Sequence, residues 1–259
     1  MLGRSGDADT IILYVHGRAA GEEEEPNKSL KQVLPCLERE NAAHVLMFYW
    51  PGSGEGGIVG FPEDQARQAA PSLGQVLADL QRYKKENTAR VQHHKFVLLL
   101  HSMGNIVFEE FLRSFGSGSL QRDLFDTVVL SASATSAKGH AEWLQKGDFT
   151  SHLYVTVNEN DPVIDKLGVR EREGRLGKKL TTFFGGPVPL AANALYVDIG
   201  RTGIDTHRYF LKSGQKGNPD LAQFFQSVLR GEAFPFDGFS GVEDVKQRDG
   251  ATIYYFKHR

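Results

Sequence analysis

Several features that would assign a chain to a special class are scarce or missing in these 259 residues. There is one cysteine, Cys36, so no internal disulfide framework can form, and this usage is typical of a reducing compartment. The formal net charge of −2 gives no electrostatic reason to expect nucleic acid or an anionic membrane as a partner. The apolar runs have the length of strands, and the first ten residues lack the apolar segment of a signal peptide. We therefore expect a cytoplasmic protein without stable membrane insertion.

Motifs for metals and nucleotides are also missing. The chain has no H-E-x-x-H motif and no close cluster of cysteine and histidine, so we predict no metal site. The glycine-rich run PGSGEGG at 51–57 lacks the G-K-[ST] ending of a phosphate-binding loop, and we interpret it as an ordinary loop. No cofactor is predicted.

Short apolar or β-branched runs alternate with longer helical patterns along the chain, which is typical of a parallel sheet with crossover helices. We predict an α/β fold of three layers, with a mostly parallel β-sheet flanked by helices. The predicted strands are 10–16, 44–50, 95–100, 127–130, 153–157 and 195–199. The predicted helices are 28–39, 63–86 with a kink at Pro71, a helix from Met103 through Phe115, and 220–230 with Asn218 as its cap.

These elements predict a single domain over residues 1–259. Two loop excursions are expected near 51–61 and 163–194, where glycine and proline or basic residues interrupt the pattern. A C-terminal extension covers 234–259, and its run 252–256 is expected to add an edge strand.

The candidate chemistry lies in LLLHSMGN, residues 98–105. Ser102 follows a buried strand and precedes a helix, and a serine on such a tight turn presents its hydroxyl above the edge of the sheet. Gly104 supplies the small residue usual two positions after a nucleophile, whereas Leu100 stands where a small residue is usual two positions before it. The alternative is that Ser102 only caps the helix.

A nucleophilic serine needs a general base, and the base needs a carboxylate to orient it. In this kind of fold the acid and then the histidine follow the serine in the chain, each after a later strand. Asp161 ends the fifth predicted strand and His207 follows the sixth, so we predict them as acid and base. Asp165 and Asp198 are the alternative acids.

The same reasoning predicts two backbone donors for an oxyanion. One is the N–H of Met103, directly after the serine, and the other is the N–H of Arg18, in the loop after the first strand. Gly17 lets that loop turn tightly against the substrate, although a simple strand-ending turn explains this glycine equally well.

Aromatic side chains near this edge of the sheet are predicted to line an apolar pocket for an acyl group. They are Trp50, Phe61 and the pair at 183–184, and the alternative for each is packing in the core or a loop. His101 adjoins the serine, but the alternation of the strand is expected to turn it away.

Four motifs, taken in order, resemble one known superfamily. They are YVHG at 14–17, the strand ending Trp50–Pro51, HSMGN at 101–105 and the N-D turn at 160–161. The chain resembles the α/β-hydrolase superfamily, and within it an uncharacterised bacterial branch of serine hydrolases. After the fourth strand, VVLSASATS at 128–136 has no carboxylate where relatives often have an aspartate, which favours Asp161 as the acid.

The resemblance implies an esterase- or lipase-like serine hydrolase that cleaves a carboxylic ester, thioester or amide through an acyl-enzyme, without a cofactor. The implied partner is a small-molecule acyl substrate. A non-catalytic hydrolase-fold protein that binds a ligand or partner, and an acyltransferase, are the alternatives, and no oligomeric state is predicted.

Overall fold

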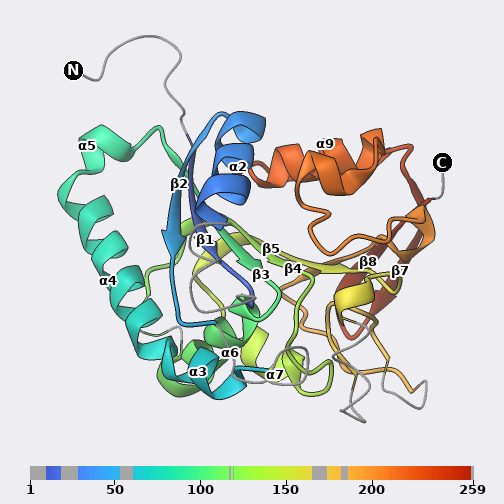
Figure 1. The fold of residues 1–259 in the computed structure, drawn as a ribbon, viewed down its shortest axis with the longest axis horizontal. Coiled ribbons are helices and arrows are strands. Elements are labelled where there is room, and N and C mark those ends of the chain that lie inside the picture. The colour runs from blue at the N-terminus through green and yellow to red at the C-terminus, as the bar shows by residue number, and fades with distance from the viewer. Residues whose placement is uncertain are drawn as a thin grey trace.

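The structure is a computed structural model, and it describes residues 10–18, 29–52, 61–116, 118, 120–164, 174–181 and 186–257. Within these residues eight strands form one sheet in the order β2-β1-β3-β4-β5-β6-β8-β7 (Figure 1). All neighbouring strands are parallel except β7 and β8. The strands are β1 Thr10–Val15, β2 Ala43–Phe48, β3 Lys95–His101, β4 Phe125–Ser131, β5 Thr150–Val157, β6 Leu195–Asp198, β7 Val242–Arg248 and β8 Ala251–Phe256.

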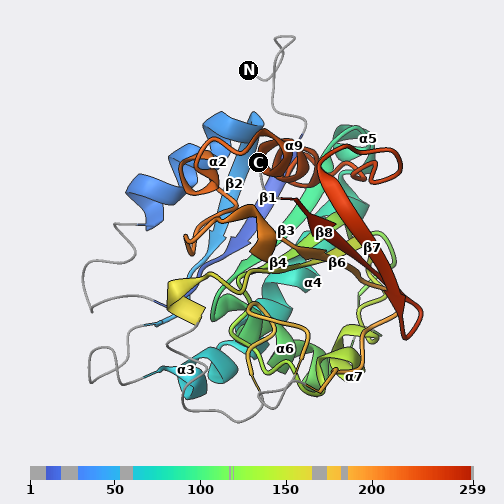
Figure 2. The same cartoon turned by 90° about the vertical axis from the view of Figure 1, so that its right-hand side faces the viewer.

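Helices cover both faces of this sheet, so the predicted three-layer α/β fold is confirmed. Figures 1 and 2 show α2 and α9 on one face and α3, α6 and α7 on the other. The described helices are η1 Ser29–Val33, α2 Leu34–Asn41, α3 Glu63–Gln68, α4 Ala70–Glu86, α5 Thr88–Val91, α6 Gly104–Phe115, α7 His140–Leu144, η3 Gly200–Thr202, η4 Lys212–Gln215 and α9 Pro219–Val228. The central strands β1, β3 and β4 are almost fully buried because each has helices on both sides.

The parallel register brings the carboxyl ends of neighbouring strands to one edge of the sheet. Val15, at the end of β1, pairs with Leu100 of β3, and His101 at the end of β3 pairs with Ser131 at the end of β4. The loops that follow these strands therefore meet at one edge, where parallel α/β sheets bind ligands.

Two predictions about helices can be compared with the structure. The predicted helix 63–86 is interrupted at Ala69, next to Pro71, and Pro71 lies in the first turn of α4. A proline is tolerated there because the first N–H groups of a helix have no intrahelical acceptor. The predicted cap of α9 is confirmed, since Asn218 Oδ1 accepts the N–H groups of Asp220 and Leu221 at 3.1 and 3.0 Å.

The C-terminal extension contributes two strands to the sheet, β7 and β8, whereas the sequence predicted one. Its run 252–256 belongs to β8, which lies inside the sheet between β6 and β7, so the prediction of an edge strand there is wrong. The edge strand is β7, with the sequence VEDVKQR. Strand alternation did not reveal β7 because its residues are mostly exposed or half-buried and several carry charge.

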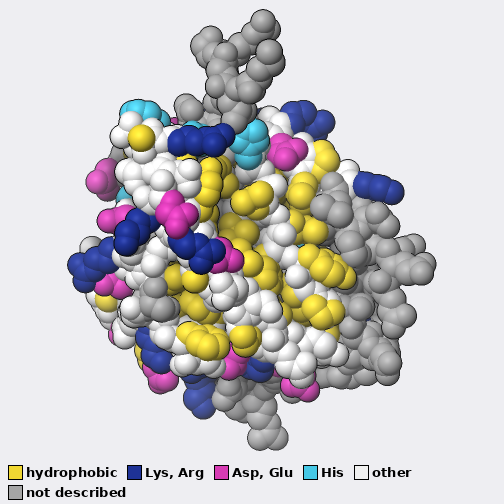
Figure 3. All heavy atoms as spheres, turned by 90° about the vertical axis from the view of Figure 1, so that its left-hand side faces the viewer, with side chains coloured by type: hydrophobic (Ala, Val, Ile, Leu, Met, Phe, Trp, Pro, Cys, Tyr) yellow, Lys and Arg dark blue, Asp and Glu magenta, His cyan; other side chains and the backbone are white. Residues whose placement is uncertain are grey.

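The opposite edge of the sheet is β2, and exposed apolar side chains occur on this side of the molecule. Figure 3 shows hydrophobic side chains gathered on this face. The exposed side chains include Leu46 of β2 and Tyr49, which directly follows β2. Val76 and Tyr83 of α4 are exposed as well. Within the described ranges, no helix is both long and apolar enough to traverse a bilayer.

Candidate active site

Ser102 has the backbone expected of a strand-to-helix elbow. Its φ is +53°, in the left-handed region that residues other than glycine rarely adopt. Hydrogen bonds hold this conformation: the Ser102 N–H donates to Ser131 O at 3.0 Å, and its carbonyl accepts from Asn105 Nδ2 at 2.9 Å and from the Ala134 N–H at 3.2 Å. The strained residue is thus fixed from both α6 and the loop after β4.

Gly104, the first residue of α6, lies directly against the end of β1. A Cβ on this residue would lie 2.5 Å from the carbonyl oxygen of Val15 and 2.6 Å from that of His16, so only glycine fits there. Leu100 is fully buried in β3, and the elbow forms with this larger residue in place.

Asp161 and His207 lie together, as predicted. His207 Nδ1 is 2.8 Å from Asp161 Oδ2. Asp161 is completely buried, and its Oδ1 also accepts the N–H groups of Val163 and Ile164 at 2.9 and 3.2 Å. Since a carboxylate only accepts, Nδ1 of His207 carries the proton and Nε2 is left as a proton acceptor.

His207 meets the elbow through His101. The ring centroids of the two histidines are 4.6 Å apart, and His101 Nε2 is 3.2 Å from the carbonyl oxygen of His207. The prediction that His101 faces away from the serine missed this contact. Within the described residues no hydrogen bond joins Ser102 Oγ to His207. Such bonds often tighten only when substrate binds.

The loop after β1 packs directly against the serine. A Cβ on Gly17 would lie 2.7 Å from Ser102 Cβ and 3.2 Å from His101 Nδ1, so glycine is required for this approach. Arg18 follows in the chain, and the N–H of Met103 donates no hydrogen bond among the described residues. The two predicted oxyanion donors therefore belong to the elbow itself and to the loop that packs against it.

The His16 side chain connects this loop to Trp50, which follows β2. The Trp50 N–H donates to His16 Nε2 at 3.2 Å, and His16 Nδ1 donates to Gly17 O at 2.6 Å. The Trp50 indole N–H returns a bond to His16 O at 2.9 Å, and the two rings stack. Burial lowers the pKa of His16, which is consistent with a neutral ring that both donates and accepts.

The predicted pocket residues have different surroundings. Trp50 is buried and braces His16. Phe61 is half-buried, and the Arg18 guanidinium lies 5.1 Å from the centre of its ring. The pair at 183–184 lies outside the described residues.

The alternative acid Asp198 has a hydrogen-bond partner other than His207. Asp198 Oδ1 accepts the N–H of Gly200 at 2.8 Å, and burial raises the pKa of its carboxyl group. Within the described part of the chain, the hydrogen bond to His207 Nδ1 comes from Asp161 and not from Asp198. Asp165 lies outside the described residues.

Three residues of the site escaped sequence reasoning: His16, His101 and Asn105. The motifs YVHG and HSMGN contain all three, so the motifs themselves were the available signal. His16 and His101 contact residues that follow other strands, and Asn105 contacts the backbone of Ser102 and Ser131. The apolar pattern of a strand does not encode such contacts.

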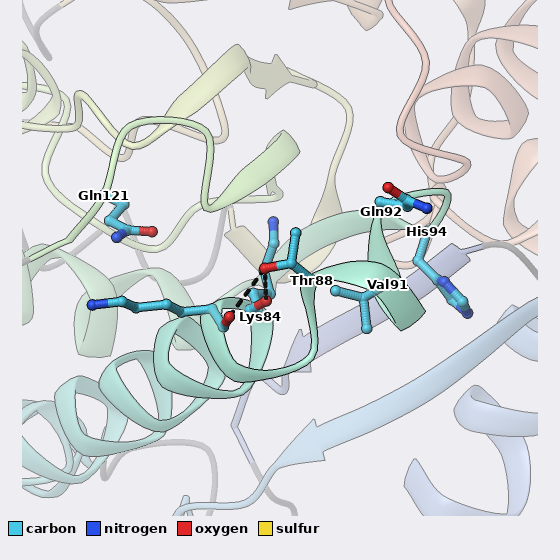
Figure 4. Close-up of a pocket in the computed structure, with 7 residues that line it drawn as sticks. Lys84, Thr88, Val91, Gln92, His94 and Gln121 are labelled. Atoms are coloured by element: carbon cyan, nitrogen blue, oxygen red, sulfur yellow. Dashed lines mark hydrogen bonds between the residues drawn. The ribbon is translucent and has the colours of Figure 1, made fainter.

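A pocket lies at the other end of the sheet. Figure 4 shows this pocket of about 340 Å³ beside the end of α4, with Lys84, Thr88 and His94 among its lining residues. His94 directly precedes β3, whereas Ser102 follows it, so this pocket is remote from the elbow. In the described ranges no group of three or more His, Cys, Asp or Glu side chains is arranged to hold a metal ion.

Comparison of the chain with protein-family models gave no match, and comparison with curated protein sequences gave none either.

Proposed function

We propose that the protein is a serine hydrolase of the α/β-hydrolase type that cleaves a carboxylic ester, or a related thioester or amide, of a small molecule. The observation that carries the proposal is the combination of a strained Ser102 at the elbow with a half-buried His207, paired with the buried Asp161, against the same strand end. Strain at a residue that many contacts hold in place is typical of functional sites.

The proposed reaction begins when His207 Nε2 removes the hydroxyl proton of Ser102. Oγ forms a bond to the acyl carbon, and the carbonyl π electrons move to oxygen. The N–H groups of Met103 and Arg18 stabilise this oxyanion. The ester C–O bond then breaks, and His207 transfers its proton to the departing alkoxide.

Water completes the cycle. His207 Nε2 takes a proton from the water, whose oxygen attacks the acyl carbon of the acyl-enzyme. When the second tetrahedral intermediate collapses, the bond to Ser102 Oγ breaks and the proton returns to Oγ. Asp161 keeps its charge throughout and stabilises the imidazolium of His207 in each half-reaction.

The deciding experiment is labelling with a fluorophosphonate probe, which reacts with an activated serine. We expect the folded wild type to be labelled and Ser102→Ala to be unlabelled. Ser114→Ala is the matched control, because Ser114 lies on α6, the helix that follows Ser102, and its exposed hydroxyl bonds to Glu110; this variant should be labelled normally. A folded wild type that resists the probe would contradict the proposal and favour a non-catalytic binding protein.

A cytoplasmic location stays a prediction from the sequence. Hydrolysis of p-nitrophenyl esters of increasing chain length, with and without an added alcohol as competing acceptor, separates a hydrolase from an acyltransferase.

A further inference from the structure

His101 is a buried histidine that the proposed reaction does not use. It is the last residue of β3 and directly precedes Ser102, so their Cα atoms are about 3.8 Å apart. Only 4% of His101 is exposed. The centroid of its ring is 4.6 Å from that of His207 and 5.0 Å from that of Phe210.

The hydrogen bond of His101 defines its protonation. A backbone carbonyl only accepts, so the 3.2 Å contact with His207 O places the proton on His101 Nε2. Burial holds the pKa of His101 well below its ordinary value, and the nearby His207 and Arg208 lower it further. His101 therefore stays neutral, and it does not repel the imidazolium that forms on His207 during turnover.

The segment that carries His207 has little regular structure of its own. It runs between the short helices η3 and η4, and hydrogen bonds with other loops hold it. Asn158 Nδ2 donates to Ile204 O at 2.9 Å, and the Tyr209 hydroxyl accepts the N–H of Ala132 at 2.7 Å. The His101 bond, in contrast, acts on His207 itself, and it comes from the strand that leads into the nucleophile.

We propose that His101 is a positioning residue that couples the base to the nucleophile: its Nε2–H holds the backbone carbonyl of His207, so one short stretch of chain sets the place of both Ser102 and His207. This inference rests on the proposed function. Asp161 fixes the orientation of the His207 ring, and His101 fixes the position of its backbone. A base displaced by about 1 Å can lower a rate by about 100-fold, so such a second anchor matters.

Two substitutions separate the hydrogen bond from the bulk of the ring. His101→Gln can place an amide N–H near the position of Nε2, whereas His101→Leu fills space without a donor. We expect His101→Leu to lower kcat for a p-nitrophenyl ester by about 10- to 100-fold with KM unchanged. His101→Gln should stay within about threefold of the wild type, and Phe210→Leu, which removes the other ring contact but not the bond, should resemble it.

Equal losses in the Gln and Leu variants, or full activity in His101→Leu, would overturn the proposal. Far-UV circular dichroism and the thermal midpoint identify a variant that fails to fold, in which case the comparison of wild type with His101→Gln still decides. If kcat and KM change together in His101→Leu, the residue acts on the general structure and not on the base, which also overturns the proposal.

A second readout does not depend on activity. The His207 Nδ1 proton faces the buried Asp161 carboxylate, so it should give a slowly exchanging downfield resonance in ¹H–¹⁵N spectra, assigned by its loss in His207→Gln. We expect this resonance in His101→Gln and its broadening beyond detection in His101→Leu. An unchanged resonance in His101→Leu refutes the positioning role, whether or not the wild type shows hydrolase activity. A wild type without hydrolase activity counts instead against the proposed function.

Discussion

Replacing Asp161 with asparagine tests the assignment of acid and base with little change in shape. The amide oxygen of the Asp161→Asn variant can still accept the N–H groups of Val163 and Ile164, so the turn after β5 should persist. The new NH₂ group, however, faces His207 Nδ1 at the former 2.8 Å contact. Two donors cannot share a hydrogen bond, so His207 moves its proton to Nε2 and can no longer take one from Ser102.

The expected loss follows from this change of tautomer. In Ser-His-Asp triads it lowers kcat by about 10⁴-fold, which corresponds to about 5.4 kcal/mol of transition-state stabilisation. The hydrogen bond to a buried charge becomes one between neutral groups, which should cost about 1 kcal/mol of folding free energy. Initial rates on a p-nitrophenyl ester measure the first quantity, and urea unfolding measures the second.

Asp198→Asn is the matched control, because this carboxylate lies at the end of the neighbouring strand and bonds to Gly200 N. It should keep kcat within about threefold, since a group that takes no part in the proposed reaction contributes little to the transition state. If Asp161→Asn retains more than a tenth of the wild-type kcat while Ser102→Ala is inactive, the assignment of the acid is refuted.

Three other consequences can be measured. Gly17→Ala should reduce activity by at least about 100-fold because its Cβ would lie 2.7 Å from Ser102 Cβ, whereas Gly118→Ala, with nothing within 4 Å, should be neutral in the same assay. Asn218→Ala should lower the free energy of unfolding by about 1 kcal/mol through loss of the α9 cap, with kcat unchanged, as urea unfolding and kinetics would show. Stability should also fall on acidification, because burial lowers the pKa of three histidines: His16, His101 and His140. The stability that these histidines contribute is complete above the unfolded pKa of about 6.5 and decreases below it. At a pH of about 5.5, each histidine that stays neutral in the fold lowers the free energy of unfolding by up to about 1.4 kcal/mol. A midpoint of urea unfolding that is higher at a pH of about 5.5 than at about 7.5 would contradict this.

The sequence predicted the parts of the molecule that follow from chain order and burial. Runs such as FVLLL at 96–100 are apolar on both faces, which is typical of strands in a parallel sheet that helices cover on both sides. Once the strands are parallel, their carboxyl ends meet at one edge. That is why Asp161 and His207 could be paired from sequence, although 46 residues separate them.

Contacts between loops could not be predicted in the same way. Alternation along β3 says which face His101 occupies, but the neighbour on that face is His207, which arrives from a loop 106 residues later. The bond between Trp50 and His16 likewise joins the ends of two adjacent strands. Polar side chains in loops carry no periodic signal, so such pairs emerge only from the three-dimensional structure.

The elbow shows why a motif can be half-matched and the geometry still form. A small residue is needed wherever the backbone of another element comes within contact distance of a Cβ, and at this elbow that place is Gly104, above the carbonyls of Val15 and His16. Leu100 instead pairs with Val15 inside the sheet and is buried there, where a large apolar side chain contributes to the core. The requirement for glycine therefore belongs to the contact between α6 and the end of β1. It follows that Leu100→Gly, which repairs the motif by sequence alone, should destabilise the protein without improving the elbow.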